Sequence, residues 1–180
     1  PGFHTGQQFV CVETPEALSL AAAGLPGDDV LVIEYLNARG ADGKARKYRV
    51  MTIGGQLYPL HLAISDDWKV HYFSAEMSGN AAHQAEEAAF LNDMPGVLGP
   101  KVMRSLQQIS DTLGLDYGGM DFALGPNGEV LLFEANATML IRPPKPGAQW
   151  DYRRATINRA LEAARGLVFE RAGARAIAHA

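Results

Sequence analysis

Cysteine is almost absent from this sequence, because the 180 residues include only Cys11. One cysteine allows no internal disulfide and no cysteine-rich zinc cluster, so we expect a reducing compartment, the cytoplasm. Positive charge is not in excess: 16 Lys and Arg against 20 Asp and Glu give a formal net charge of −4, which argues against a nucleic-acid partner. No apolar run of about 18 residues is present, so we expect no membrane partner. The 47% of hydrophobic residues predicts a globular protein with a real core.

The chain begins Pro1-Gly2-Phe3-His4-Thr5-Gly6, without Met and without a targeting pattern. We therefore expect it to start inside a loop of a longer protein. Two glycines and a hydroxyl group in this loop could place backbone N–H groups around an anionic phosphate. This makes Gly2, His4, Thr5 and Gly6 candidate nucleotide-binding residues, with an ordinary turn as the alternative.

Glycine and proline divide the rest of the chain into short segments. Gly54-Gly55 and Gly125-Pro126-Asn127-Gly128 each separate two such segments and predict two β-hairpins. Helices are expected over 16–21, 81–92, 101–113 and 150–165, and strands over 7–13, 30–33, 48–53, 56–63, 68–73, 115–124 and 129–136. These elements predict an α+β fold with a mainly antiparallel sheet packed with helices.

The segment Val30-Leu31-Val32-Ile33 is apolar and mostly β-branched, which is typical of a strand buried on both faces. At its end, Glu34-Tyr35-Leu36 could offer backbone N–H and C=O groups to a purine edge, with the apolar strand as the floor of the pocket. The alternative is an ordinary strand end.

The second hairpin carries the most informative pattern. If Leu124 pairs with Glu129 across the four-residue turn, Asp121 lies opposite Leu132, and cross-strand partners share a face. One face of the hairpin is then wholly apolar and is expected to be the core side: Met120, Phe122, Leu124, Leu131, Phe133 and Ala135.

The other face of this hairpin carries Asp121, Glu134 and Asn136, with the two acids near a diagonal arrangement. Carboxylate and amide oxygens without His or Cys are the ligands of a hard cation such as Mg²⁺ or Mn²⁺. The alternative is that all three are polar residues on the solvated face of a half-exposed hairpin. A register slip of one residue would also separate the acids onto different faces.

Two cations and a histidine lie on the first hairpin. Lys47 and Arg49 begin its first strand, where they could neutralise phosphate oxygens or a developing oxyanion, or simply be solvated. His61 follows Pro59-Leu60 in an apolar setting that is more typical of a structural histidine than of a base. In a regular hairpin Arg49 pairs with Leu60, and His61 points to the opposite face.

Charged residues on the expected helices are interpreted as solvated. His83, Glu86 and Glu87 lie one turn apart on 81–92 and could imitate a carboxylate and histidine metal site. Because no second such motif completes it, they are expected on the wet face of the helix. The arginines of the last helix are expected on its wet face or in contact with missing sequence: Arg153, Arg154, Arg159 and Arg165.

In order along the chain, these motifs resemble the ATP-grasp superfamily from Pro1 to about Arg142. The most specific elements are Leu113-Gly114-Leu115-Asp116-Tyr117-Gly118-Gly119-Met120-Asp121-Phe122 and Leu132-Phe133-Glu134-Ala135-Asn136. More narrowly, Arg46-Lys47-Tyr48-Arg49-Val50 and Pro59-Leu60-His61-Leu62-Ala63-Ile64-Ser65 are similar to ATP-grasp domains at the C-terminus of tetratricopeptide-repeat proteins. Family members also have an N-terminal domain and a phosphate-binding basic residue on an earlier strand, which this sequence lacks.

The resemblance implies residues 1–36 as a remnant of the first ATP-grasp subdomain, 37–166 as the second subdomain and 167–180 as a tail. It also implies an ATP- and Mg²⁺-dependent ligase that joins a small-molecule or peptide carboxylate to an amine or thiol through an acyl phosphate. Asp121, Glu134 and Asn136 would hold Mg²⁺, the Gly2 to Gly6 loop would cover the phosphates, and Glu34 to Leu36 would line the adenine pocket.

The resemblance further assigns Arg49 to the γ-phosphate or the tetrahedral intermediate, with Lys47 beside it and His61 as a third catalytic candidate. The alternative function is a nucleotide-binding or regulatory module without turnover, and a third is a kinase-like phosphotransferase. An incomplete chain with exposed core edges could also form a homodimer.

Overall fold

The computed structural model describes residues 8–27, 29–70, 75 and 77–173. The chain divides into two compact units, Pro1–Asn37 and Ala38–Ala180, here called unit 1 and unit 2. Each unit is described by itself.

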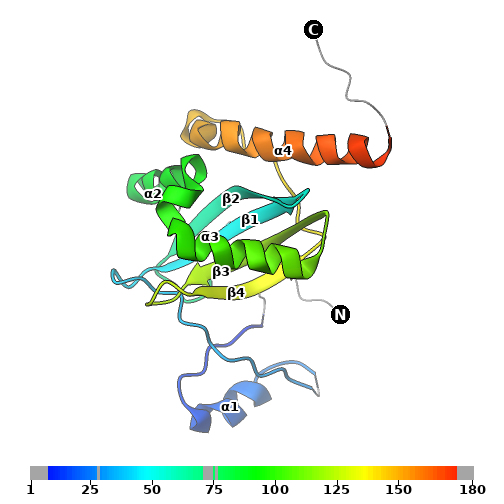
Figure 1. The fold of residues 1–180 in the computed structure, drawn as a ribbon. Helices are drawn as coiled ribbons and strands as arrows, with labels where there is room; N and C mark the ends of the chain where they lie inside the picture. Colours follow the sequence, from blue (N-terminus) through cyan, green and yellow to red (C-terminus); the bar gives the residue numbers. More distant parts are fainter. Residues whose placement is uncertain (1–7, 28, 71–74, 76, 174–180) are drawn as a thin grey trace. The chain divides into compact units, whose positions relative to one another are not determined.

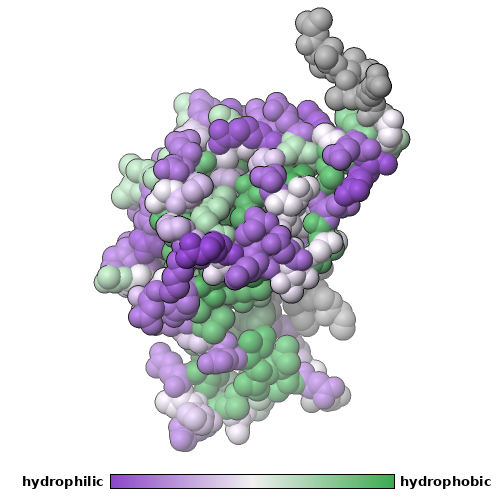
Figure 2. Space-filling model, in the orientation of Figure 1, coloured by the Kyte–Doolittle hydropathy of each residue, from purple (hydrophilic) through white to green (hydrophobic). Residues whose placement is uncertain are grey.

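Unit 1 contains a short 3₁₀ helix, η2 (Pro15–Ala17), followed by α1 (Leu18–Ala23). Proline at the first turn of η2 agrees with the expected helix start. The strands expected over 7–13 and 30–33 are wrong, because residues 8–13 and 30–33 have no strand pairing. Leu31 is 85% exposed, and hydrophobic residues lie at the surface around α1 in Figure 2. An apolar, β-branched run forms a strand only when a neighbouring strand is present to bond with it.

Unit 2 is built on a four-stranded antiparallel sheet in the order β2-β1-β3-β4 (Figure 1). The strands are β1 (Ala45–Ile53), β2 (Gln56–Ser65), β3 (Tyr117–Leu124) and β4 (Val130–Asn136). Both expected hairpins are present, and the predicted α+β fold with an antiparallel sheet packed with helices is confirmed. The strand expected over 68–73 is not found at 68–70, and residues 71–73 lie outside the described residues.

Three longer helices pack on this sheet: α2 (Ala81–Asn92), α3 (Met94–Leu113) and α4 (Asp151–Arg171), the last preceded by a 3₁₀ turn, η3 (Ala148–Trp150). Among the described residues, none of the helices has the combined length and apolarity that crossing a bilayer requires.

The limits of α2 and α3 follow from local chemistry. The Asn80 side chain accepts hydrogen bonds from two N–H groups of the first turn of α2. In α3, Gly99 has a positive φ of 74° directly before Pro100, which interrupts the helix just before the start expected from the sequence. Gly114, with φ of 61°, ends α3 in the left-handed conformation that glycine adopts readily.

The sheet has a different hydrophobic cluster on each face. Alternate residues of β1, such as Tyr48 and Val50, pack with Phe122 against α2 and α3. On the opposite face, Met51 and Ile53 pack against α4. The polar side chains in the first half of β1 lie on this second face of the sheet.

Candidate functional site

A row of polar residues crosses all four strands on the α4 face of the sheet. Arg49 on β1 is the cross-strand partner of His61 on β2 and of Asp121 on β3, and Asp121 is the partner of Glu134 on β4. Cross-strand partners share a face, so these four residues, here called the polar row, lie side by side. Lys47 lies two residues before Arg49 on the same face of β1.

A β-bulge places His61 in the polar row. Val50 pairs with Pro59, whereas Arg49 pairs with His61, so Leu60 is an extra residue in β2. The expected pairing of Arg49 with Leu60, with His61 on the opposite face, is therefore wrong. The bulge has a physical reason: a regular register from the Gly54-Gly55 turn would turn Leu62, which is fully buried in the α2 and α3 cluster, to the polar face.

A second bulge adjusts the acidic hairpin. Asp121 pairs with Glu134 and Phe122 with Leu132, so Phe133 is the extra residue, and the expected pairing of Asp121 with Leu132 is wrong. The expectation that the apolar face of this hairpin is the core side is also wrong at β4. This strand lies at the edge of the described sheet, and its Phe133 is 42% exposed. Asp121, Glu134 and Asn136 nevertheless share one face, and the two acids lie directly opposite rather than on a diagonal.

Asp121 is the electrostatic centre of the polar row. Only 2% of this residue is exposed. Arg49 donates from Nε and Nη2 to its two carboxylate oxygens at 2.6 and 2.8 Å, and Lys47 Nζ lies 3.1 Å from Oδ2. Burial acts to raise the pKa of Asp121, but the Arg49 hydrogen bonds and the charge of Lys47 outweigh it and lower that pKa. The carboxylate is therefore held ionised.

Arg49 and His61, the next two residues of the row on β1 and β2, have opposite pKa shifts. Burial disfavours the charged form of Arg49, but its bonds to Asp121 prevail and raise its pKa. Burial and the nearby charge of Arg49 together lower the pKa of His61 well below 6.5. The imidazole is therefore held neutral beside a permanent guanidinium cation.

The shifted pKa of His61 predicts a pH dependence of stability. As the pH falls below 6.5, the unfolded chain takes up a proton at His61 and the folded chain does not. The free energy of unfolding therefore falls on acidification, by at most about 1.4 kcal/mol per pH unit from this residue. We expect His61→Gln to have the smaller slope in urea titrations between about pH 7.5 and 5.

Glu87, whose burial raises its pKa, contributes a slope of the opposite sign. Because Glu87 is present in both proteins, comparing wild type with His61→Gln removes its contribution. Parallel slopes in the two proteins would show that His61 is protonated equally in the folded and unfolded chains.

Glu134 and Asn136 form the exposed end of the site on β4. Asn136 Nδ2 donates to Glu134 Oε1 at 2.5 Å, and Thr138 donates from its N–H and its hydroxyl to Asn136 Oδ1. With Asp121, these side chains supply only oxygen ligands on one face, which fits a hard divalent cation by chemistry. Such an ion would share Asp121 with Arg49 and Lys47. The described residues contain no group of three His, Cys, Asp or Glu that could hold a metal.

The remaining predicted site residues, those expected to bind the nucleotide, precede the sheet in the chain. Glu34, Tyr35 and Leu36 belong to unit 1, and no buried strand precedes them. The expected loop of Gly2, His4, Thr5 and Gly6 lies outside the described residues.

The interpretation of several helical charges as solvated is wrong. Glu87 is 0% exposed, and His83 and Arg153 are also buried. Glu87 is ion-paired with Arg153 across α2 and α4, at 3.2 Å.

A sequence signal for the β2 bulge was present at Pro59. Proline cannot donate a ladder hydrogen bond, and proline within a strand is typical of edges and bulges.

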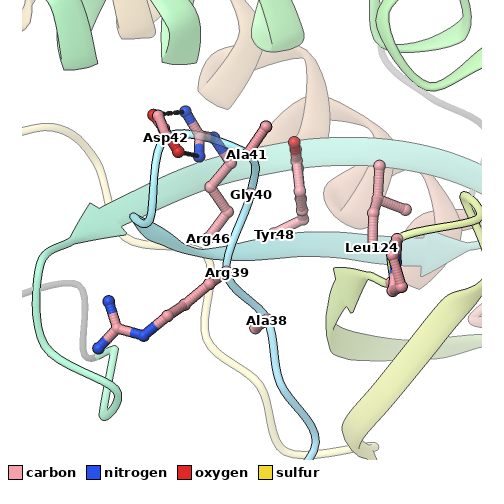
Figure 3. Close-up of a pocket in the computed structure, with 10 residues that line it drawn as sticks. Ala38, Arg39, Gly40, Ala41, Asp42, Arg46, Tyr48 and Leu124 are labelled. Carbon is pink, nitrogen blue, oxygen red and sulfur yellow. Dashed lines mark hydrogen bonds and ion pairs between the residues drawn. The ribbon is translucent and has the colours of Figure 1, made fainter.

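A separate cavity of about 640 Å³ lies at the other face of β1. Arg46 and Tyr48, which line it, alternate along the strand with Lys47 and Arg49 and so point away from the polar row. Figure 3 shows the Arg46 guanidinium facing Asp42, to which it donates two hydrogen bonds. Because Arg46 also bonds Glu86, its charge is already balanced within the protein.

Comparison of the chain with protein-family models, with curated proteins and with solved structures gives no match.

Proposed function

We propose that unit 2 carries the metal and phosphate half of an ATP-grasp site, in an ATP- and Mg²⁺-dependent ligase that joins a carboxylate to an amine or a thiol. The observation that carries the proposal is the polar row, in which neighbouring strands bring two acids, a guanidinium and an imidazole onto one face. Two bulges are needed to align it, and bulges often occur beside active sites.

The residues divide naturally between metal and phosphate. Asp121, Glu134 and Asn136 would hold Mg²⁺, which when bound neutralises and orients the nucleotide phosphates. Arg49, with two donors in a planar fork, suits phosphate or acyl-phosphate oxygens, and Lys47 adds a second cation. His61, held neutral, could accept or donate a hydrogen bond to a bound substrate.

The reaction proposed has two transfers. A substrate carboxylate oxygen attacks the γ-phosphorus of ATP, the bond to the bridging β–γ oxygen breaks, and ADP leaves with that oxygen. The amine nitrogen or the thiol sulfur then attacks the acyl carbon, loses its proton to solvent or to a base, and displaces inorganic phosphate. Positioning and charge neutralisation by the polar row would supply most of the rate enhancement.

The test is a thermal-shift titration of the chain with Mg²⁺, with a non-hydrolysable ATP analogue and with both. We expect the two together to raise Tm by about 5 to 10 °C when the analogue is at roughly 100 times its Kd, because binding to the folded state stabilises it. Glu134→Gln removes a charge from the exposed end of the site and is expected to abolish most of the shift. Asp121→Asn combined with it should abolish the rest.

Glu129→Gln, at the turn of the same hairpin, is the matched control and should keep the wild-type shift. A shift without Mg²⁺, or one unchanged in Glu134→Gln, would place the nucleotide elsewhere. Absence of any shift or calorimetric heat at millimolar analogue would remove nucleotide binding as a function of this chain.

A second candidate function is a nucleotide-binding or regulatory module without turnover. It is favoured by the state of Asp121, whose Oδ1 accepts a hydrogen bond from Arg49 and whose Oδ2 is shared by Arg49 and Lys47. The two functions differ in phosphate release. A ligase releases phosphate from ATP only with both a carboxylate and an amine or thiol present, whereas a binding module shows the Tm shift and no release.

A further inference from the structure

A buried ion pair lies against the outer edge of β2, outside the polar row. Glu87 comes from α2, and Arg153 and Tyr152 come from α4. Arg153 Nε lies 3.2 Å from Glu87 Oε1, and the Tyr152 hydroxyl donates to Glu87 Oε2 at 2.5 Å. The side chain of Glu87 is fully buried and that of Arg153 is only 10% exposed. Water therefore cannot freely hydrate either charge.

The same pair binds the backbone on each side of His61. Arg153 Nη2 donates to the carbonyl of Leu60 at 3.1 Å, and the N–H of Leu62 donates to Glu87 Oε1 at 3.3 Å. Since β2 is an edge strand of the described sheet, none of the other described strands lies beside its outer edge to bond these groups. Glu87 and Arg153 therefore take the place of a neighbouring strand at the bulge.

We propose that Glu87 and Arg153 are positioning residues that hold the β2 bulge, and with it the imidazole of His61, in line with Arg49. The proposal rests on the proposed function, because it concerns the placement of a side chain in that site. The placement itself can be measured whether or not a nucleotide binds.

The energetics favour a positional role over a purely stabilising one. Burial raises the pKa of Glu87 although Arg153 and Tyr152 act to lower it, so the charged form of Glu87 carries a desolvation penalty that these partners do not fully offset. Well-packed apolar residues often give equal or greater stability than a buried ion pair. What apolar side chains cannot do is bond both the carbonyl of Leu60 and the N–H of Leu62.

The test compares Arg153→Lys with Thr156→Val. Lysine keeps the positive charge near Glu87 but lacks the fork that bonds Glu87 and Leu60 together. Thr156 lies one turn further along α4, is also buried, and donates to a carbonyl of α2, that of Leu91, rather than of β2. Its replacement weakens the packing of α4 without touching the bulge.

In NMR spectra, we expect Arg153→Lys to shift the ring ¹⁵N signals of His61 and to weaken the cross-strand contacts between His61 and Arg49. Amide exchange at Leu62 should rise about tenfold, the factor implied by weakening a bond to a charged group. Thr156→Val should leave these signals in place at a comparable loss of Tm. Unchanged His61 signals in Arg153→Lys, or equal changes in both variants, would overturn the proposal.

Glu87→Gln is the second variant and serves if Arg153→Lys does not fold. It keeps the shape of the side chain and removes the charge that orients Arg153, so the same His61 signals should shift. The Kd for the Mg²⁺–ATP analogue should rise about tenfold in the positioning variants and stay unchanged in Thr156→Val. If wild type binds no analogue, the proposed function fails, while the His61 signals still decide the placement.

Discussion

Replacement of Asp121 by asparagine is expected to lower the free energy of unfolding by about 3 kcal/mol, because it removes one partner of a largely buried charge cluster. The side chains of Arg49 and Lys47 are only 25% and 16% exposed, so water does not fully replace the lost carboxylate. The amide of asparagine can accept a hydrogen bond from one cation but carries no charge. Urea denaturation at neutral pH measures the loss.

Asp42→Asn is the matched control for Asp121→Asn. Asp42 also receives two hydrogen bonds from one arginine, Arg46, but its side chain is 46% exposed. We expect a much smaller effect there, because solvent screens an exposed ion pair. Equal losses in the two variants would show that burial contributes nothing to the Asp121 cluster.

Phe122→Ala is expected to destabilise unit 2 by about 4 kcal/mol. Phe122 is fully buried, and its ring stacks on Tyr48 with the centroids 5.3 Å apart. Truncation removes apolar contacts with α2 and α3 and leaves a cavity that surrounding helices fill only in part. Phe122 directly follows Asp121 on β3. Truncation of its side chain is therefore also expected to make the β3 backbone that carries Asp121 less rigid.

Phe133→Ala tests whether this effect depends on burial. Phe133 is the extra residue of the β3–β4 bulge and is 42% exposed, so its truncation should cost about 1 kcal/mol. Denaturation of both variants in urea, followed by tryptophan fluorescence, gives the comparison. A Phe122→Ala loss no larger than that of Phe133→Ala would mean that the α2 and α3 face is not closely packed.

Local sequence patterns were sufficient to predict most elements of unit 2. The paired glycines at 54–55 and the turn at 125–128 define the two hairpins, because positive φ and tight turns are local properties. The helix over 81–92 and the stop at Gly114 follow in the same way from composition and capping. The common face of Asp121, Glu134 and Asn136 was also predicted.

Registers and charge burial were decided by the tertiary structure. The sequence placed Arg49 opposite Leu60, but burial of Leu62 against α2 and α3 requires a bulge, and this brings His61 to Arg49. The burial of Glu87 depends on Arg153, which lies 66 positions further along the chain on another helix. No local pattern reports such a partner.

Unit 1 shows that a local sequence pattern can also predict a strand that the folded chain does not form. The run from Val30 to Ile33 has every local property of a buried strand and yet is exposed and unpaired with any described strand. Turns and helix ends are determined by the sequence itself because their bonds join residues a few positions apart. Strand pairing, bulges and buried ion pairs join distant residues, so only the folded chain decides them.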